Sequence, residues 1–552
     1  MMQQRVEELL GRMTLEEKAG LMFQTMVMVG DPVDMIDERS MNHFNVLGSA
    51  SPREMAEWHN RLQERAAATR LGIPVTLSTD PRNSFSNNPG AAIMAGSFSQ
   101  WPESTGLAAI GDEALVEAFA DVARQEYLAV GIRVALHPQI DLATEPRWAR
   151  VNATFGEDAE LTSRLVKAYI RGFQGGELGK DSVACMTKHF PGGGPQKDGE
   201  DPHFAYGREQ VYPGDNFDYH LRPFEAAFEA GTSQIMPYYG MPVGTQYEEV
   251  GFGFNKGVIT GLLRERYGFD GIVCTDWGLL TDAEIMGQPM PARAWGVEHL
   301  TPVERALKAL EAGVDQFGGE ACPSLIVELV RSGRVAESRI DESVRRLLRE
   351  KFTLGLFDDP FVDPARAEEV VGRAAFVRAG LEAQRASVTL LKNGPLPLVE
   401  GLSLYVEGVD PAVAGAYGKV VGTPEEADFS IVRLSAPYEP REGGFEAFFH
   451  SGSLAFPDEE IARLTRLPSA ILDVYLERPA VFPELAEHAV AVLANYGASD
   501  TAFLDVVFGR AEPRGRLPFE LPRSMAAVEA SRSDVPRDSE NPLYPFGHGL
   551  SY

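Results

Sequence analysis

The chain has 552 residues, of which 44% are hydrophobic and 24% are charged, and its formal net charge at pH 7 is −29. This length exceeds that of one ordinary domain, so we expect at least two domains, each with its own core. The strong acidity excludes nucleic acid and membrane surfaces as expected partners, because proteins bind both through basic patches.

The chain begins with a predicted helix, since Thr14 and Glu17 have the spacing of a capping box. Short apolar runs, which predict strands, then alternate with amphipathic stretches, which predict helices. The strand-like runs are 73–80, 132–138, 182–189, 233–239, 271–276 and 313–317, and the helical stretches include 114–130, 161–173 and 301–313. This alternation indicates parallel strands joined by helical crossovers. Six or more such units favour a (β/α)8 TIM-like barrel, with a doubly wound sheet as the alternative.

A second α/β region follows the barrel. Residues 355–370 are rich in Asp and Pro and are typical of a linker that leads into a helix. A second strand series then occupies 403–408, 429–437, 469–477 and 489–497. We therefore expect a barrel over 1–355, a linker over 356–385 and an α/β sandwich domain over 386–552.

Polar side chains stand at the ends of the barrel's predicted strands. They are Asp80, the pair Lys188 and His189, Tyr239 and Asp276, with Arg147 and Arg150 in the loop after 132–138. Each alone has an ordinary structural explanation, such as a turn, a surface ion pair or a helix cap. In a parallel barrel, however, all strand C-termini open onto one face, so these groups are expected to converge there.

The three cysteines, Cys185, Cys274 and Cys322, have no zinc-site spacing and give no disulfide framework, so we expect inert thiols. A metal between His189 and His203 is disfavoured by the charge of Lys188. No phosphate-binding glycine motif occurs, and we expect neither a metal nor another cofactor. Residues 1–13 have no signal-peptide pattern, which leads us to expect a cytoplasmic protein.

Seven stretches, in this order, resemble the family 3 glycoside hydrolases, the beta-glucosidase group. They are MTLEEKAGLMF, EPRWARVNATFGED, KHFPGGG, GIVCTDWG, VTLLKNGPLPL, GRLPFELP and YPFGHGLSY. The resemblance implies a barrel-like first domain and an α/β sandwich, in the two-domain form without a fibronectin-type domain.

Position by position, the resemblance makes Asp276 the catalytic nucleophile. It also implies a set of residues that grip or wall the innermost sugar: Asp80, Arg150, Lys188, His189, Met236, Tyr239 and Trp277. Elementary chemistry agrees, because glycoside cleavage needs one carboxylate to attack the anomeric carbon and one acid to protonate the leaving oxygen. Arginine and lysine supply the hydrogen-bond donors that hold hydroxyl groups.

The proton donor of such beta-glucosidases comes from a loop of the second domain. Here the loop follows strand 429–437, and Glu439, Glu442 and Glu446 are the candidates. We select Glu439, beside Arg441. A second hypothesis comes from the N-acetylglucosaminidases of the family, whose KHFPGHG motif precedes an Asp-x-His dyad. Asp201 and His203 are similar to that dyad, although Gly193 replaces the motif's histidine.

The expected function is that of a retaining exo-acting beta-glycosidase, most simply a beta-D-glucosidase, acting on a small-molecule beta-glycoside. A beta-xylosidase, a beta-N-acetylhexosaminidase using Asp201 and His203, and a non-catalytic carbohydrate-binding homologue are the alternatives. The sequence leaves the aglycone, the linkage and a homodimeric state open.

Overall fold

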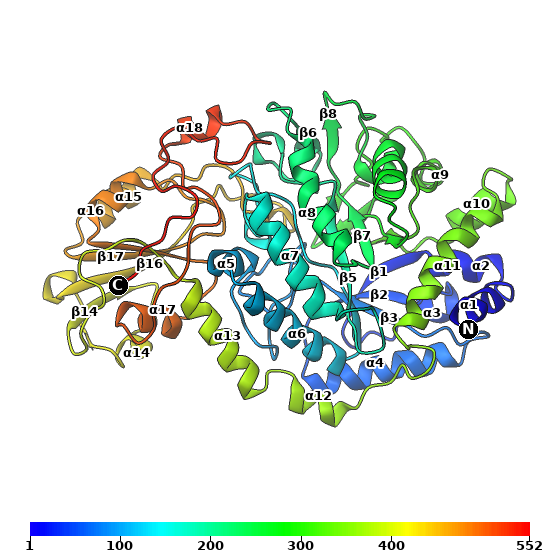
Figure 1. The fold of residues 1–552 in the computed structure, drawn as a ribbon, viewed down its shortest axis with the longest axis horizontal. Helices are drawn as coiled ribbons and strands as arrows, with labels where there is room; N and C mark the ends of the chain where they lie inside the picture. The colour runs from blue at the N-terminus through cyan, green and yellow to red at the C-terminus, as the bar shows by residue number, and fades with distance from the viewer.

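The structure is a computed structural model that describes residues 1–552 and contains two α/β domains, each built on its own sheet (Figure 1). The larger domain lies on the right of Figure 1 and the smaller one on the left. The helices α12 (Pro364–Val370) and α13 (Ala374–Ser387) run between them along the lower edge. None of the helices combines the length and the hydrophobicity needed to span a bilayer.

The first domain is a barrel of eight parallel strands in the order β12-β1-β2-β3-β4-β5-β7-β9. The strands are β1 (Phe23–Met28), β2 (His43–Leu47), β3 (Thr76–Thr79), β4 (Ile132–Ala135), β5 (Ala184–Phe190), β7 (Gln234–Pro237), β9 (Ile272–Val273) and β12 (Phe317–Gly318). A parallel bridge between Cys274 and Gln316 joins the last strand to the first and closes the ring. The predicted barrel is therefore confirmed.

The six predicted strands all form, and β1 and β2 complete the eight. The sequence of β1 predicts no strand, because the polar residues Gln24 and Thr25 interrupt its apolar run after Phe23. The connection from β1 to β2 also lacks a full crossover helix and contains only α3 (Met35–Glu38). The usual alternation of strand and helix is therefore absent where the barrel begins.

Helices cover the outside of the barrel and make both faces of its strands buried. They are α4 (Pro52–Ala67), α5 (Ser104–Ile110), α6 (Glu113–Ala129), α7 (Ala159–Gln174), α8 (Phe217–Glu229), the π-helix η5 (Gly257–Arg266), α9 (Pro302–Ala312), α10 (Ser324–Arg331) and α11 (Glu337–Thr353), with α1 (Met2–Leu10) and α2 (Leu15–Leu21) before β1. The predicted capping box is present, since the Thr14 side chain accepts from the Glu17 N–H. Such caps fix where a helix begins and hence where the preceding loop ends.

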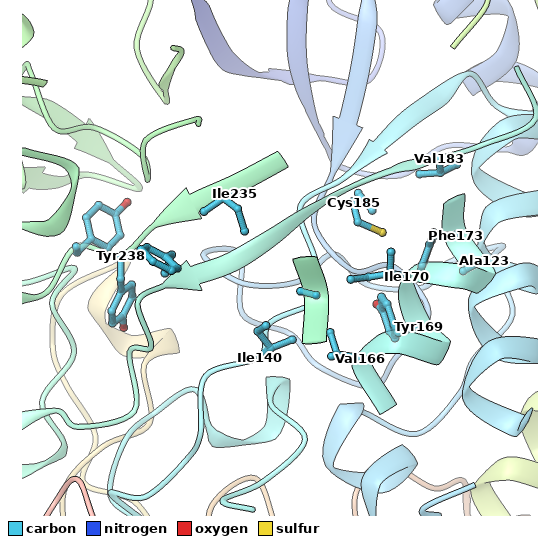
Figure 2. Packing of buried hydrophobic residues seen from close by; sticks show 14 of the residues in the cluster. Ala123, Ile140, Val166, Tyr169, Ile170, Phe173, Val183, Cys185, Ile235 and Tyr238 are labelled. Atoms are coloured by element: carbon cyan, nitrogen blue, oxygen red, sulfur yellow. The ribbon is translucent and has the colours of Figure 1, made fainter. Parts of the chain in front are cut away.

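The contact between α7 and β5 shows how the apolar positions of an amphipathic helix form part of the hydrophobic core (Figure 2). The apolar face of α7 presents Val166, Tyr169, Ile170 and Phe173 to the barrel, and all four are buried. Cys185 lies against them from β5 and is likewise buried and free. Burial raises the pKa of the Cys185 thiol well above its usual value, which supports the expectation of an inert thiol.

The second domain is a six-stranded sheet with helices on both faces. Its strand order is β13-β18-β17-β16-β14-β15, and only β13 pairs antiparallel. The strands are β13 (Thr389–Lys392), β14 (Ser403–Glu407), β15 (Lys419–Val420), β16 (Phe429–Ser435), β17 (Ala470–Tyr475) and β18 (Ala491–Asn495). The helices are α14 (Pro411–Ala414), α15 (Asp458–Leu464), α16 (Pro483–His488), α17 (Asp500–Val507) and α18 (Met525–Ala530). The four predicted strands of this domain and its α/β sandwich architecture are confirmed.

Two buried polar side chains hold the domains together. Arg478, only 1% exposed, donates to the carbonyl of Arg147 in the barrel and to those of Pro437 and Gly452 in its own domain. Glu103, which precedes α5 of the barrel, accepts a 2.6 Å hydrogen bond from the Tyr475 hydroxyl at the end of β17. Its second oxygen is buried and has no partner.

The pH dependence of stability tests the Glu103 contact. Burial raises the pKa of Glu103 to about 8 from an ordinary value of 4.5. The unfolded chain therefore releases this proton at lower pH than the folded chain, and stability falls as pH rises from 4.5 to 8, by up to about 1.4 kcal/mol per pH unit. Glu103→Gln removes this loss, so we expect the variant to become more thermostable than the wild type toward pH 8.

Calorimetric melting of both proteins at pH 5, 6, 7 and 8 measures the effect. The melting temperature of the variant should exceed that of the wild type by a margin that grows with pH. Parallel profiles would show that Glu103 ionises as easily in the folded chain as in the unfolded one.

Candidate active site

A pocket of about 390 Å³ opens at the C-terminal end of the barrel strands. Every sequence-predicted sugar-contacting residue lines it, together with Asp276 and His203. These residues come from β5 and β7 or from the loops that follow β3, β4, β5, β7 and β9, so the convergence expected of a parallel barrel is observed. The second domain contributes Phe445 to the lining.

Asp276 stands three residues beyond β9, in the wall of the pocket. Its Oδ1 accepts from the N–H of Trp277 at 2.9 Å, while its Oδ2 is buried without any hydrogen-bond partner in the protein. The chain continues into the hairpin β10 (Ala283–Ile285) and β11 (Gln288–Met290) rather than a helix, so Asp276 caps no helix. Oδ2 therefore has its acceptor capacity available to a ligand.

The floor of the pocket contains a buried ion pair. Lys188 Nζ lies 3.3 Å from Asp80 Oδ1, and Asp80 Oδ2 accepts from the Asn45 side chain at 3.3 Å. Burial lowers the pKa of Lys188, and the attraction of Asp80 opposes that effect. The pair presents an ammonium donor and a carboxylate acceptor side by side, which suits neighbouring hydroxyl groups.

A second buried chain of contacts orients His189. Its Nδ1 lies 2.9 Å from Asp141 Oδ2, and its Nε2 lies 3.3 Å from Arg150 Nη1. Because a guanidinium group can only donate, Nε2 must accept and Nδ1 must carry the proton. Burial and the nearby Arg150 lower the pKa of His189 well below its usual value, so the ring is neutral. Arg150 also donates to Gln139 at 3.0 Å.

The wall next to Asp276 is made by Trp277, Met236 and Tyr239. The Tyr239 hydroxyl donates to the Trp277 carbonyl at 2.5 Å, which fixes both aromatic residues. A Cβ atom on Gly318 or Gly319 would lie within 2.4 to 2.7 Å of the Trp277 ring, so the indole needs glycine beneath it. Trp277 Nε1 is buried without a partner.

The Asp201–His203 dyad is formed, with His203 Nδ1 2.6 Å from Asp201 Oδ1. Burial lowers the pKa of His203, even though Asp201 acts in the opposite direction. Gly193 cannot be replaced by a histidine here. A Cβ atom at this position would lie 2.5 Å from the Tyr238 ring and 2.9 Å from Asp141.

None of the three candidate glutamates lines the pocket. Glu439 is exposed, its N–H donates to the Ser451 carbonyl at 2.8 Å, and its side chain lies over Gly452. Glu442 is exposed as well. Glu446 accepts from the Tyr206 hydroxyl at 2.8 Å and from Gln288 at 3.4 Å, so both of its oxygens serve the junction between the domains.

Sequence reasoning missed several parts of the site. Asp141, which orients His189, lies six residues beyond β4, and its position after a predicted strand was an available signal. Asn45 was missed because β2 was not predicted. Conversely, Arg147 pairs with Glu145 at 2.8 Å and does not enter the pocket, so only Arg150 of the two loop arginines belongs to the site.

Comparison with known proteins adds independent findings. Residues 25–350 match the family model described as "Glycosyl hydrolase family 3 N terminal domain", and residues 419–552 match the corresponding C-terminal domain. The chain is 57% identical to "Probable beta-glucosidase C" of Aspergillus flavus, covering 100% of this chain and 90% of the relative. It is 44% identical to "Periplasmic beta-glucosidase/beta-xylosidase" of Dickeya chrysanthemi, with the same coverage. The fold is similar to that of a solved β-glucosidase from Erythrobacter marinus, with a TM-score of 0.81 at 22% identity, over 100% of this chain and 83% of the other.

The protonation state of His189 is directly testable. We expect its imidazole to stay neutral, with the proton on Nδ1, from pH 5 to pH 8, because burial and the nearby Arg150 lower its pKa well below the ordinary value of 6.5. Nitrogen-15 NMR of histidine-labelled protein, with His189→Gln to assign the signal, measures this. An imidazolium signal at pH 6 would contradict the assignment. In Asp141→Asn, whose amide can donate to Nδ1, the fraction of the Nδ1–H tautomer should fall.

Proposed function

The chain belongs to glycosyl hydrolase family 3, and we propose that it is a retaining, exo-acting β-glucosidase that removes terminal β-glucosyl residues through a covalent intermediate on Asp276. The observation that carries this proposal is the unpartnered Oδ2 of Asp276, which is buried in a pocket rich in hydroxyl-binding groups. The names of the Aspergillus flavus and Dickeya chrysanthemi relatives support the substrate class.

The chemistry of the pocket agrees with a nucleophilic role for Asp276. A carboxylate that attacks an anomeric carbon needs one oxygen free of hydrogen bonds, and Oδ2 meets that condition. His189 Nε2 lies 3.9 Å from this oxygen and accepts from Arg150, so the neutral ring does not donate to the carboxylate. The nucleophile thus keeps its lone pairs for the substrate.

The hydrogen-bond donors and acceptors on the floor of the pocket favour a sugar as the ligand. Lys188 and Arg150 offer donors, whereas Asp80 and Asn45 offer acceptors, and all four are buried in the lining of one pocket. A hexose presents hydroxyl groups that both donate and accept, so it can bond the buried polar groups that have no protein partner. A pocket closed at this end accommodates a terminal residue, which is the basis for proposing exo action.

For the proton donor we propose Glu439, the residue implied by family resemblance. Its loop is fixed at the base, because Arg478 binds the carbonyls of Pro437 and Gly452 on either side of it. The exposed side chain itself makes no such contact, so it is the part of the loop that can turn toward a bound glycoside. This role requires Glu439 to approach the pocket when substrate binds.

His203 is the second candidate, favoured by its place in the pocket lining. Its protonation state argues against it. Nδ1 is bonded to Asp201, so a neutral ring exposes the lone pair of Nε2, which can accept a proton but cannot give one. The lowered pKa of His203 keeps the acidic imidazolium form scarce near neutrality. The position of Gly193 has no room for a side chain, so the site cannot contain the histidine of the hexosaminidase motif.

A β-xylosidase activity is a second function favoured by one observation, the name of the Dickeya chrysanthemi relative. The loop after β3 adjoins the site through Asp80, Pro89 and Gly90. Xylose lacks the hydroxymethyl group of glucose, so equal turnover of both nitrophenyl glycosides would indicate that no pocket group depends on that substituent. Turnover of glucoside alone would identify a strict β-glucosidase.

Substitution of the nucleophile tests the mechanism. We expect Asp276→Asn to lower kcat for 4-nitrophenyl β-glucoside by about 10⁴-fold or more, because the amide cannot form the glycosyl-enzyme. Glucose binding measured by calorimetry should persist and report that the pocket is folded. The matched control is Asp181→Asn at an exposed site outside the pocket. Near-normal turnover by Asp276→Asn would overturn the mechanism, and glucose binding by a wild type without turnover would indicate a carbohydrate-binding homologue.

Azide rescue distinguishes the two proton donors. In Glu439→Ala, hydrolysis of a glucoside with a good leaving group should form the intermediate normally but break it down slowly, and added azide should restore the rate as glucosyl azide forms. His203→Ala should show no such rescue. Rescue at His203→Ala and none at Glu439→Ala would transfer the acid/base role to the dyad.

A further inference from the structure

The mouth of the pocket differs chemically from its floor. Beyond the polar residues that surround Asp276, the lining changes to apolar side chains from five separate segments. These mouth residues are Met26, Leu47, Pro89, Ala283, Ile285, Met286 and Phe445. A glycoside held with its sugar on the floor directs its leaving group toward this mouth, because the reacting bond lies between the two.

Both domains contribute residues to the mouth, and hydrogen bonds between the domains hold these residues in place. The hairpin β10–β11 carries Ile285 and Met286, and Gln288 on the same hairpin accepts from the backbone N–H groups of Phe445 and Glu446 at 3.1 and 2.9 Å. Phe445 packs against the loop after β3, where a Cβ atom on Gly90 would lie 3.0 Å from its ring. The apolar surface is therefore a constructed part of the site.

Two methionines of the mouth are exposed to solvent. Met26, on β1, is 36% exposed and Met286, in the β10–β11 hairpin, is 56% exposed. Exposed apolar area beside a ligand pocket gains free energy when an apolar group covers it. Methionine is also flexible and polarizable, so it adapts to ligands of different shape.

Two polar residues of the mouth already use hydrogen-bonding groups within the protein. Thr281 donates to Glu320 at 2.6 Å, and Arg293 is directed at the carbonyls of His203 and Trp277 at 3.4 and 3.5 Å. Only the exposed Glu284 points a polar side chain at solvent. A second sugar in the mouth would lose water from its hydroxyl groups and find few protein partners, which is costly.

We propose that this mouth is a binding site for an apolar aglycone, so that the preferred substrates are aryl or alkyl β-glucosides rather than oligosaccharides. The inference rests on the proposed β-glucosidase function and deepens it by naming the chemical class of the leaving group. Met26, Met286 and Phe445 form the surface that the aglycone covers, and the sugar-binding floor holds the glucosyl unit.

A series of alkyl β-glucosides tests the proposal on the wild-type protein. The methyl, butyl, hexyl and octyl compounds, kept below their micelle concentrations, have leaving groups of nearly equal pKa and differ only in apolar area. We expect kcat/KM to rise by about fourfold for each methylene group that becomes buried, the equivalent of ~0.8 kcal/mol. Cellobiose, whose leaving group is a sugar, should have a lower kcat/KM than hexyl glucoside.

Matched methionine substitutions locate the effect. Met26→Gln and Met286→Gln keep side-chain length but remove apolar character, and each should lower the hexyl-to-methyl ratio of kcat/KM by about fourfold. The controls are Met28→Gln and Met94→Gln, at methionines that are 49% and 62% exposed but lie outside the pocket lining. The controls should keep the wild-type ratio.

The outcomes separate this inference from the function on which it rests. Glucoside hydrolysis with no dependence on chain length, or with a preference for cellobiose, would overturn the apolar aglycone site and leave the β-glucosidase intact. A chain-length dependence that the double variant Met26→Gln/Met286→Gln retains would overturn the assignment to this surface. Absence of hydrolysis for every β-glucoside would reject both proposals.

Discussion

The pairing that closes the barrel is the constraint on which the active site depends. The bridge between Cys274 and Gln316 joins the strand that precedes Asp276 to β12, which in turn pairs with β1. Because all eight strands run parallel, closure collects their C-terminal ends in a ring. Without it, Asp276 would lie at the edge of an open sheet, far from the strands that carry Asp80 and Asn45. The positions of the catalytic side chains thus depend on a backbone bridge whose own residues, Cys274 and Gln316, take no part in catalysis.

Within that ring, the polar side chains near Asp276 form hydrogen bonds and ion pairs with one another rather than with the free oxygen of Asp276. Asp141 holds one nitrogen of His189 and Arg150 holds the other, while Asp80 is matched with Lys188. Each of these buried charged groups thereby has at least one protein partner, which is what burial demands. Among the buried carboxylate oxygens of the site, Asp276 Oδ2 alone has no partner, and an unsatisfied buried oxygen is costly unless a ligand or solvent meets it. The site is organised around one reactive oxygen.

Much of this organisation could be predicted from sequence, for a physical reason. Strands buried on both faces give continuous apolar runs, so a polar residue at the end of such a run, such as Asp80 or Asp276, is conspicuous. The two earliest strands escaped because Gln24 and Thr25 interrupt the apolar run of β1 and its crossover is short. The same strand carries the exposed Met26, which lines the opening of the pocket. Prediction from the hydrophobic pattern fails for β1 because this strand contributes residues to the protein surface as well as to the core.

Contacts between the domains were beyond sequence reasoning. The Gln288 side chain accepts from the backbone of Phe445, and the Arg478 side chain donates to the carbonyl of Arg147. Both contacts join residues far apart in the chain, and no local pattern signals them. For the same reason the position of Glu439 outside the pocket could not be foreseen. The family likeness identified the loop, but its placement depends on how two separate sheets pack together.

The central claim is that Asp276 forms a covalent bond to the sugar. Incubation with 2,4-dinitrophenyl 2-deoxy-2-fluoro-β-glucoside slows breakdown of the glycosyl-enzyme, and peptide mass spectrometry can then locate the label. We expect one fluoroglucosyl group per chain, attached to the peptide that contains Asp276, with release on addition of a glycosyl acceptor. Label on another carboxylate, or rapid turnover of a wild-type protein that never accumulates label under these conditions, would contradict the account.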